Sequence, residues 1–432
     1  ARIRATGGAF YSDLELKEFN DFTYPGSRFV RGADGVTTGF LPNYPLTNPS
    51  VASGGNASTG YFSDAGPFPT DVIFRNDILR TDKQLGLFGE VAFEIVPDVL
   101  TLTGGTRYYD IKVDLEGSAN SSFFNLNSAI FGANAGVAPG TGVDAQRAGT
   151  NISAQFAPGN AVGAPDKART DGFIFKGTLT YTPTPDLLFY ATYSEGFRPG
   201  LLNRPGGAAG PNGFTVPYQL DTDEVKNYEI GWKTEFADGQ IRLNGSAFYV
   251  DISRLQTTIF DPSITNLFFS DNAANAEIKG IEADFTFAPN EVPGLTVSGA
   301  FSILDTEITE VLTPTNDVIA GEELAFAPSF QGNLRVRYEW DLTGDLGAYI
   351  QPQLSHSASK LTDIIEINKL ELASYTVFDL ATGITGDQWS LEIFGENLFD
   401  KRAELSGNFV FDRARITTNR PMTIGMRVSF DY

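Results

Sequence analysis

The end of the chain, residues 422–432, shows the clearest alternation. Apolar side chains occupy the even positions, and small or polar ones, among them Arg427 and Asp431, occupy the odd positions. A repeat of two predicts a β-strand with one apolar and one hydrated face. The apolar face includes Val428, Phe430 and Tyr432. Length and terminal aromatics suit a tilted strand that crosses a bilayer, although an edge strand of a soluble sandwich has the same pattern.

Similar alternation recurs along the whole chain and predicts about fourteen strands. The predicted strands cover residues 3–19, 80–95, 100–115, 172–181, 187–197, 224–236, 241–257, 276–287, 295–308, 330–340, 347–359, 373–384, 389–398 and 422–432.

The connections alternate between tight turns and long loops. The tight turns lie at 96–98, 182–186, 237–239, 290–294, 341–345 and 386–387. The long loops lie at about 20–79, 117–171, 199–222, 260–275, 310–327 and 401–420. An up-and-down membrane barrel, with short turns on the periplasmic side and long loops outside, has this arrangement. A Greek-key sandwich does not sort its loops in this way.

This order also orients the barrel. The first strand precedes a long loop and the last strand follows one, so both ends of the chain are expected on the periplasmic side. The first long loop contains Tyr24, Tyr44 and Tyr61 among polar residues. These tyrosines fit a surface that contacts a ligand, and they equally fit a loop that packs its aromatic rings on its neighbours.

Composition narrows the classes of function. The formal net charge of −22 argues against nucleic acid as a partner, because no basic stripe is available for phosphates. The chain has no cysteine and one histidine, His356, which leaves out thiolate chemistry and makes histidine-based metal sites and triads poor candidates. No apolar run is long enough for a transmembrane helix, whereas barrel strands need no such run.

Six short motifs resemble the barrel of TonB-dependent outer-membrane receptors, notably the long-looped alphaproteobacterial type. They are LFGE at 87–90, GGTRY at 104–108, YSEGFRPG at 193–200, NYEIGWK at 227–233, KGIE at 279–282 and ENLFDKR at 396–402. They occur in order, ahead of the aromatic terminal strand, and span nearly the whole chain. The resemblance implies active import of a scarce nutrient: an iron-siderophore, haem, cobalamin or an oligosaccharide.

The resemblance also implies partners and a larger barrel. Members of the family resemble 22-stranded barrels with an N-terminal plug that a TonB complex rearranges. Neither a plug nor a TonB box is recognisable ahead of the first strand, and about eight strands are unaccounted for. We therefore expect the C-terminal part of a longer receptor. The alternative is a self-sufficient, porin-like barrel of about fourteen strands for passive diffusion, and a third class is a surface adhesin.

Localisation and remaining partners follow from the same resemblance. We expect a Gram-negative outer membrane, contact with its lipid and lipopolysaccharide, and assembly by the barrel assembly machinery through the terminal strand with Val428, Phe430 and Tyr432. We expect no enzyme activity and no cofactor.

Candidate binding residues are few. Arg198, where a strand meets an outer loop, could meet an anionic ligand, and its more ordinary interpretation is an ion pair with a carboxylate. Asp221, Asp223 and Glu224 suit calcium by residue type, yet they lack EF-hand spacing and fit an acidic barrel rim.

Three strand positions carry further predictions. Alternation places Glu392 and Arg427 in the same hydrated lumen. His356 falls on the lipid-facing side near the outer rim, with Ser355 and Ser357 on the opposite side, which argues against a serine–histidine lipase pair. Pro352 lies inside a strand and lacks a backbone donor, so we predict a β-bulge there.

Overall fold

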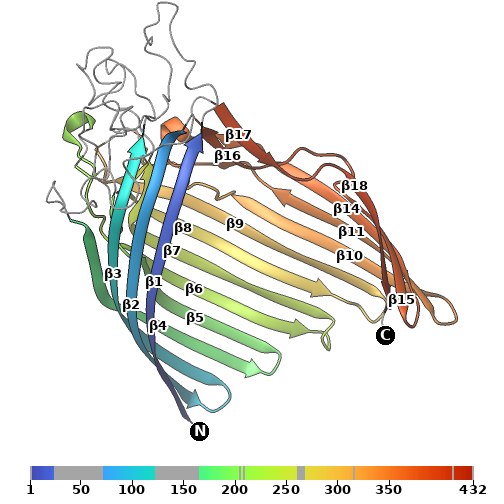
Figure 1. Ribbon diagram of the computed structural model, residues 1–432. Helices are drawn as coiled ribbons and strands as arrows, with labels where there is room; N and C mark the ends of the chain where they lie inside the picture. The colour runs from blue at the N-terminus through green and yellow to red at the C-terminus, as the bar shows by residue number, and fades with distance from the viewer. Residues whose placement is uncertain are drawn as a thin grey trace, which may run out of the picture.

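The computed structural model describes residues 2–23, 72–121, 165–203, 206–207, 210–259, 268–314, 317–410 and 413–430. Its main feature is one antiparallel sheet of 14 strands (Figure 1). The strands are β1 (Ile3–Thr23), β2 (Val72–Val96), β3 (Leu100–Ser121), β4 (Lys167–Thr184), β5 (Leu187–Arg198), β6 (Asp223–Phe236), β7 (Ile241–Ile259), β8 (Phe269–Phe287), β9 (Leu295–Val311), β10 (Phe330–Thr343), β11 (Leu346–Ser357), β14 (Tyr375–Thr385), β15 (Trp389–Glu396) and β18 (Thr423–Phe430).

Each strand of the sheet pairs with the next one along the chain, which confirms the predicted up-and-down order. Several strands extend into the predicted loops, and β2 begins at Val72 rather than at residue 80. Two small hairpins lie outside the main sheet: β12 (Lys360–Leu361) with β13 (Glu371–Leu372), and β16 (Glu404–Val410) with β17 (Arg413–Thr418). The second hairpin lies inside the predicted loop 401–420, where alternation was too short to show it. In the described residues, β1 and β18 are the two edges of the sheet and do not pair.

The two faces of the sheet differ in chemistry. On β18, Ile424 and Phe430 are 68% and 66% exposed, whereas Arg427 points to the other face and pairs with Glu392. We call the polar side the inner face and the apolar side the outer face, since membrane barrels enclose their polar side. Large exposed apolar side chains recur on the outer face of most strands, so this face suits lipid rather than water.

Short turns gather at one end of the sheet, where β1 begins and β18 ends (Figure 1). Backbone conformations of positive φ accompany these turns, as at Asp98 (59°) and Ala237 (53°). Gly294 has φ 85°, and a Cβ there would lie 2.0 Å from the carbonyl oxygen of Glu339. The opposite end of the sheet, where the long connections join the strands, is called the mouth below.

Pro352 corrects one prediction. The ladder from β11 to β14 runs without a register shift through the pair Pro352↔Leu380. Toward β10 the register is the same on both sides of the proline, but Val336 and Arg337 have no partner in the ladder. The predicted bulge was wrong: a missing N–H removes hydrogen bonds toward one neighbour, and no extra residue is needed to accommodate it.

Among the described residues, no helix combines the length and apolar character needed to cross a membrane.

Candidate functional site at the mouth and inner wall

The inner face changes character near the mouth. On β9, Ile308 has the same orientation as Ser302, but its side chain is fully buried in an apolar cluster. The cluster joins strand residues to segments that follow β5, β9 and β11. Its buried members are Phe214, Val216, Ile259, Phe269, Ala273, Ala274, Ile308, Val318, Ile364 and Ile365. Burial of these side chains holds the connecting segments against the inner wall, because each removes apolar surface from water.

The connection between β5 and β6 spans two walls of the mouth. Leu202 packs on Tyr109 and its neighbours on β3 and β4, while Phe214 and Val216 belong to the apolar cluster on β7–β9. Asn203, only 4% exposed, donates to the carbonyl of Ser270 and accepts from its N–H, both at 2.8 Å. The described part of 199–222 is therefore a fixed crosspiece rather than a free loop.

Arg198 stands at the base of this crosspiece, at the end of β5. Its Nη2 lies 2.5 Å from Oδ2 of Asp223, and its backbone N–H donates to Oδ1 of the same side chain at 2.8 Å. Nη2 also donates to the carbonyl of Gln256 at 3.0 Å. Asp223 is 1% exposed and Arg198 is 56% exposed, so the buried carboxylate positions a guanidinium that still faces the mouth.

A second arginine is held beside the first by an unusual backbone. Arg254 sits at a register shift of β7 with φ 57°, a left-handed conformation that costs energy for a residue with a side chain. Its N–H donates to Oδ1 of Asn275 at 2.8 Å, and its Nη2 lies 2.6 Å from Oε1 of Glu224. These contacts offset the strain and fix the arginine at the rim.

The acidic residues that suit calcium by residue type are therefore largely engaged in contacts with other residues. Asp223 binds Arg198 and Glu224 binds Arg254, while the backbone carbonyl of Asp221 accepts from the Asn272 amide at 2.9 Å. No group of three or more possible metal ligands occurs in the described ranges. The arrangement at this point is an arginine–carboxylate network.

Two further carboxylates lie at the mouth end of the sheet. Burial raises the pKa of Asp271, against smaller opposing effects of hydrogen bonds from Thr313 and Asn272. Burial also raises the pKa of Asp363, whose carboxylate accepts the N–H of Ile365 at 3.0 Å. Both carboxyl groups therefore keep their proton up to a higher pH than a surface aspartate does.

Segments 312–329 and 358–374 are joined to each other. Lys369 pairs with Glu322 at 2.6 Å and also with Glu366, and the N–H of Phe326 donates to the carbonyl of Leu361 at 2.8 Å. Burial lowers the pKa of Lys369, but the two glutamates outweigh it and leave the pKa raised. The ammonium group therefore stays charged and links the two segments.

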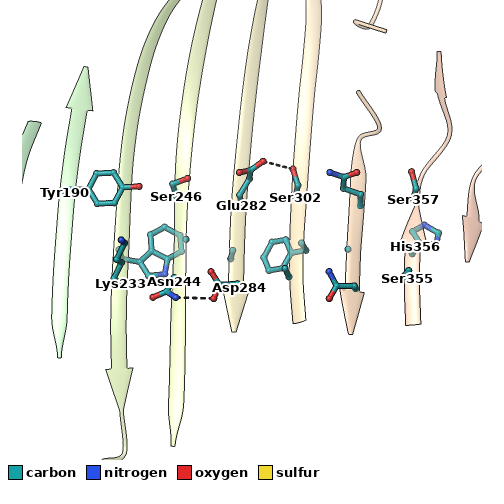
Figure 2. Close-up of a pocket in the computed structure, with 18 of the residues that line it drawn as sticks. Tyr190, Lys233, Asn244, Ser246, Glu282, Asp284, Ser302, Ser355, His356 and Ser357 are labelled. Atoms are coloured by element: carbon teal, nitrogen blue, oxygen red, sulfur yellow. Dashed lines mark hydrogen bonds between the residues drawn. The ribbon is translucent and has the colours of Figure 1, made fainter. Parts of the chain in front are cut away.

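Below the mouth, the inner wall is hollow and polar. A cavity of about 610 Å³ is lined by side chains from β5 to β14. Figure 2 shows Asn244 bonded to Asp284 and Ser302 bonded to Glu282, at 3.1 and 3.3 Å. Lys233 lies in the same wall. Such a surface stays hydrated and can line a path for a polar solute.

The predicted inner orientation of Glu392 and Arg427 is confirmed, and the two side chains form an ion pair. Arg427 Nη1 lies 2.6 Å from Oε1 of Glu392, and Tyr349 donates to the other oxygen of this carboxylate at 2.5 Å. The guanidinium of Arg427 also lies over the ring of Phe394, 5.5 Å from its centroid. Period-two alternation had placed both side chains in the lumen, and the strand register, which puts Glu392 opposite Arg427, adds the contact.

His356 lies in the outer-face register, as predicted. It is directly opposite Thr376, whose Oγ1 is 2.8 Å from Nδ1, and its ring lies 5.8 Å from that of Phe330. Ser355 and Ser357 flank it and have the opposite orientation by alternation (Figure 2). The pair needed for a lipase is not formed.

The remaining predicted site residues divide into two groups. Tyr24, Tyr44, Tyr61 and Tyr432 lie outside the described residues. Val428 and Phe430 are exposed on the outer face, which confirms their orientation and leaves their role in assembly a prediction. Sequence reasoning did not find Arg254, Asn203 and Lys369, because each of them has a partner in a segment far away in the chain.

The family described as "TonB dependent receptor-like, beta-barrel" matches residues 3–398. The chain belongs to this family of transport receptors, whose barrels lie in the outer membrane of Gram-negative bacteria.

Individual relatives are similar over part of their length. The metal-pseudopaline receptor CntO of Pseudomonas aeruginosa is 26% identical over 260 residues, which is 59% of this chain and 33% of that protein. The ferric yersiniabactin uptake receptor FyuA from Yersinia pestis has TM-score 0.61 at 18% identity, over 84% of this chain and 48% of that one. The siderophore receptor PiuA from Acinetobacter baumannii has TM-score 0.61 at 17% identity, over 100% and 53%. The chain thus spans a third to a half of these proteins.

Proposed function

We propose that this chain is the ligand-capturing barrel part of a receptor for TonB-dependent uptake of a metal–siderophore complex. The observation that carries the proposal is the junction at the mouth. Arg198, held by the buried carboxylate of Asp223, stands above a polar inner wall and beside ordered connecting segments, and Arg254 is held by Glu224 at the same rim. A site that fixes charged groups at the entrance of a hydrated lumen is suited to bind a charged ligand first and then to let it pass through the lumen.

The class of ligand follows from chemistry and from the relatives. CntO is named for metal-pseudopaline, FyuA for ferric yersiniabactin and PiuA as a siderophore receptor. Chelators of hard metal ions use anionic oxygen donors, which guanidinium groups bind well. Arg198 is the side chain we assign to first contact, and Tyr24, Tyr44 and Tyr61 remain candidates from the first long loop. Haem, cobalamin and oligosaccharides are the other classes of cargo.

Orientation and partners belong to the same proposal. The mouth faces outward, and the turn end, with the start of β1 and the end of β18, faces the periplasm. A TonB complex supplies energy through a plug that fills the lumen. Outer-membrane lipid and lipopolysaccharide surround the outer face, and the barrel assembly machinery recognises the terminal strand β18.

The porin-like interpretation receives no support from the relatives, which are receptors. In the described residues the sheet is also open between β1 and β18. An adhesin lacks any specific observation in its favour.

Metal-limited growth tests the proposal. A strain that lacks the full-length receptor should grow poorly on a supplied ferric siderophore, and the wild-type gene should restore growth only when the TonB complex is intact. Arg198→Gln should weaken binding of the labelled complex to whole cells. Arg242→Gln is a matched control, since Arg242 pairs with Glu235 near the turn end. Uptake that is independent of the TonB complex would refute the proposal.

A further inference from the structure

The sheet splits between β4 and β5 near the mouth. The pair Lys176↔Ser194 is the last one of their ladder on this side. Beyond it, β4 continues along β3 as far as Lys167, and β5 continues along β6 as far as Arg198. In the described residues these two strand ends form no further ladder with each other. We call this split the seam, and it ends beside Arg198, the side chain assigned to first contact with the ligand.

A carboxylate closes the first row of the seam. The register would next place Phe175 opposite Glu195, and here the Phe175 N–H donates to Oε2 of the Glu195 side chain at 3.0 Å. Tyr193 donates to Oε1 of the same carboxylate at 2.5 Å. A single hydrogen bond to a side chain holds two strands less firmly than a ladder does, because each further pair of a ladder adds bonds.

The outer-face residues beside the seam place it on the mouth side of the lipid. Glu195 and Lys226 are opposite each other on the outer face of β5 and β6, and charged side chains avoid hydrocarbon. Tyr193 and Tyr228 form the next outer-face row toward the turn end, with ring centroids 5.1 Å apart, and tyrosine favours the membrane interface. Water can therefore reach the seam and satisfy unpaired backbone groups there, which hydrocarbon cannot do.

On the β5 side, directional hydrogen bonds hold the crosspiece. Nε2 of Gln256 donates to the carbonyls of Pro199 and Asp221, at 3.1 and 3.0 Å, and so joins both ends of the crosspiece to β7. Asn272 of β8 donates to the same Asp221 carbonyl at 2.9 Å. Together with the Asn203 contacts, these bonds join the crosspiece and the mouth ends of β5 to β8 into one body.

Across the seam the contacts are of a weaker kind. Leu202 packs on the apolar cluster of β3 and β4, and the ring of Phe197 stacks on that of Tyr109 with centroids 3.6 Å apart. The hydroxyl of Thr222 donates to that of Thr170 at 3.4 Å, which is long for a hydrogen bond. Contacts of this kind separate at lower cost than backbone ladders, because few buried polar groups lose a partner.

Another ladder that stops short of the mouth shows the contrast. The last pair between β9 and β10 is Ile303↔Phe330, and β9 continues beyond it. There the N–H of Ile308 donates to the carbonyl of Glu322 at 2.8 Å, so the connecting segment is bonded to β9 through its backbone. In the described ranges no such backbone bond joins the crosspiece to β4. The seam is therefore the part of the mouth that side chains alone keep closed.

We propose that the mouth opens along this seam, an inference that rests on the proposed function. A ligand held at Arg198 enters the lumen when β5 and the crosspiece move away from β4, and Glu195 holds the seam closed between such events. The buried apolar cluster on β7–β9 keeps the far side of the crosspiece in place, so the movement occurs on the β4 side. Glu195 is thus a positioning residue that acts through the Phe175 N–H and does not itself bind the ligand.

Pairs of introduced cysteines in the full-length receptor test this proposal, since the chain has no cysteine of its own. Ile174→Cys with Gly196→Cys places two thiols across the seam, at the next inner-face row that the register would pair. Dibromobimane joins neighbouring thiols and becomes fluorescent, so the extent and the rate of bridging are both measured. Thr178→Cys with Thr192→Cys is the matched control, because these hydroxyls lie 3.0 Å apart in the intact part of the same ladder.

Uptake is measured with the ferric siderophore that supports growth in the test above, labelled with radioactive iron. Bridging the Ile174→Cys/Gly196→Cys pair should remove most of the uptake, while binding to cells that lack the TonB complex stays unchanged. Bridging the control pair should change neither. The proposal is overturned if uptake survives the bridge across the seam, if the control bridge causes an equal loss, or if the thiols across the seam never bridge.

The rate of bridging in the purified receptor needs no ligand, so the seam and the proposed function can fail separately. Glu195→Ala removes the acceptor of the Phe175 N–H, and bridging across the seam should slow about fivefold because the closed state loses a hydrogen bond to a charged group. Glu195→Gln keeps an acceptor and should bridge at the rate of the parent. Equal rates in the two variants would overturn the role of Glu195.

A second measurement covers the case in which the cysteine pair does not fold, as judged by circular dichroism. Hydrogen exchange of the Phe175 amide is then compared in Glu195→Ala and Glu195→Gln without introduced cysteines. Exchange should be faster in Glu195→Ala, and equal exchange in the two variants would likewise count against the proposal.

Discussion

Two stretches of the inner face have the same alternation of side chains, but one is in contact with water and the other is buried by protein. Beside the cavity, Ser302 bonds to Glu282 and the wall is polar, while three rows nearer the mouth Ile308 lies in a dry apolar cluster. Both side chains point the same way from β9. The difference arises because connecting segments cover the wall only near the mouth, so coverage decides whether an inward residue meets water or protein.

The largest effect should come from making the dry stretch polar. Ile308→Asn buries an amide among apolar groups and leaves a cavity, with an expected local cost of about 3–5 kcal/mol. Hydrogen exchange of the amides near 214–216 and 308 should rise accordingly. Ala300→Asn, on the same face of β9 beside the cavity, should leave exchange unchanged. Equal effects would mean that the two stretches do not differ.

Removing the buried carboxylate at the mouth should come next. Asp223→Ala leaves Arg198 without its partner and deletes charge-assisted hydrogen bonds, a loss of about 1.5–3 kcal/mol. Exchange in the crosspiece should rise and siderophore binding should fall. Glu224→Gln removes an exposed pair with Arg254 and should cost less than about 1 kcal/mol. If Asp223→Ala and Glu224→Gln lost similar amounts of stability, this would contradict the difference in burial between the two ion pairs.

Removal of the Asp271 charge should have a smaller effect, and it should stabilise the mouth rather than destabilise it. Burial raises its pKa in the folded state, so the ionised form opposes folding at neutral pH. Stability of the mouth should increase as pH falls through the raised pKa, because the folded state then binds the proton more readily than the unfolded one. Asp271→Asn should stabilise the mouth at neutral pH and remove this dependence in thermal melts. The exposed Asp221→Asn should change neither.

The smallest effect is expected in the hydrated stretch. Glu392→Gln weakens the pair with Arg427, whose side chain is 66% exposed, so urea unfolding should shift by less than about 1 kcal/mol. The shift should shrink further in high salt. A large, salt-independent loss would show that this part of the inner wall is as dry as the mouth.

Much of this architecture was predictable from alternation. Strands β1 to β11 and β14, β15 and β18 lie where the pattern placed them, although several extend into predicted loops, and the shared inner orientation of Glu392 and Arg427 followed from the alternation. Pro352 was misjudged, because a missing donor needs only a gap on one side of the ladder. The crosspiece and the Arg254 bulge escaped prediction, since their contacts join segments remote in sequence.

The chain's own pattern determined strand order, the two faces and the family, because a repeat of two and short turns are local properties. Tertiary structure alone decided which inward residues are dry and how Asp223 and Asn275 hold the two mouth arginines. Both features depend on contacts between segments that are distant in the chain. Whether a side chain is buried or paired is therefore set by those contacts and not by its neighbours in sequence.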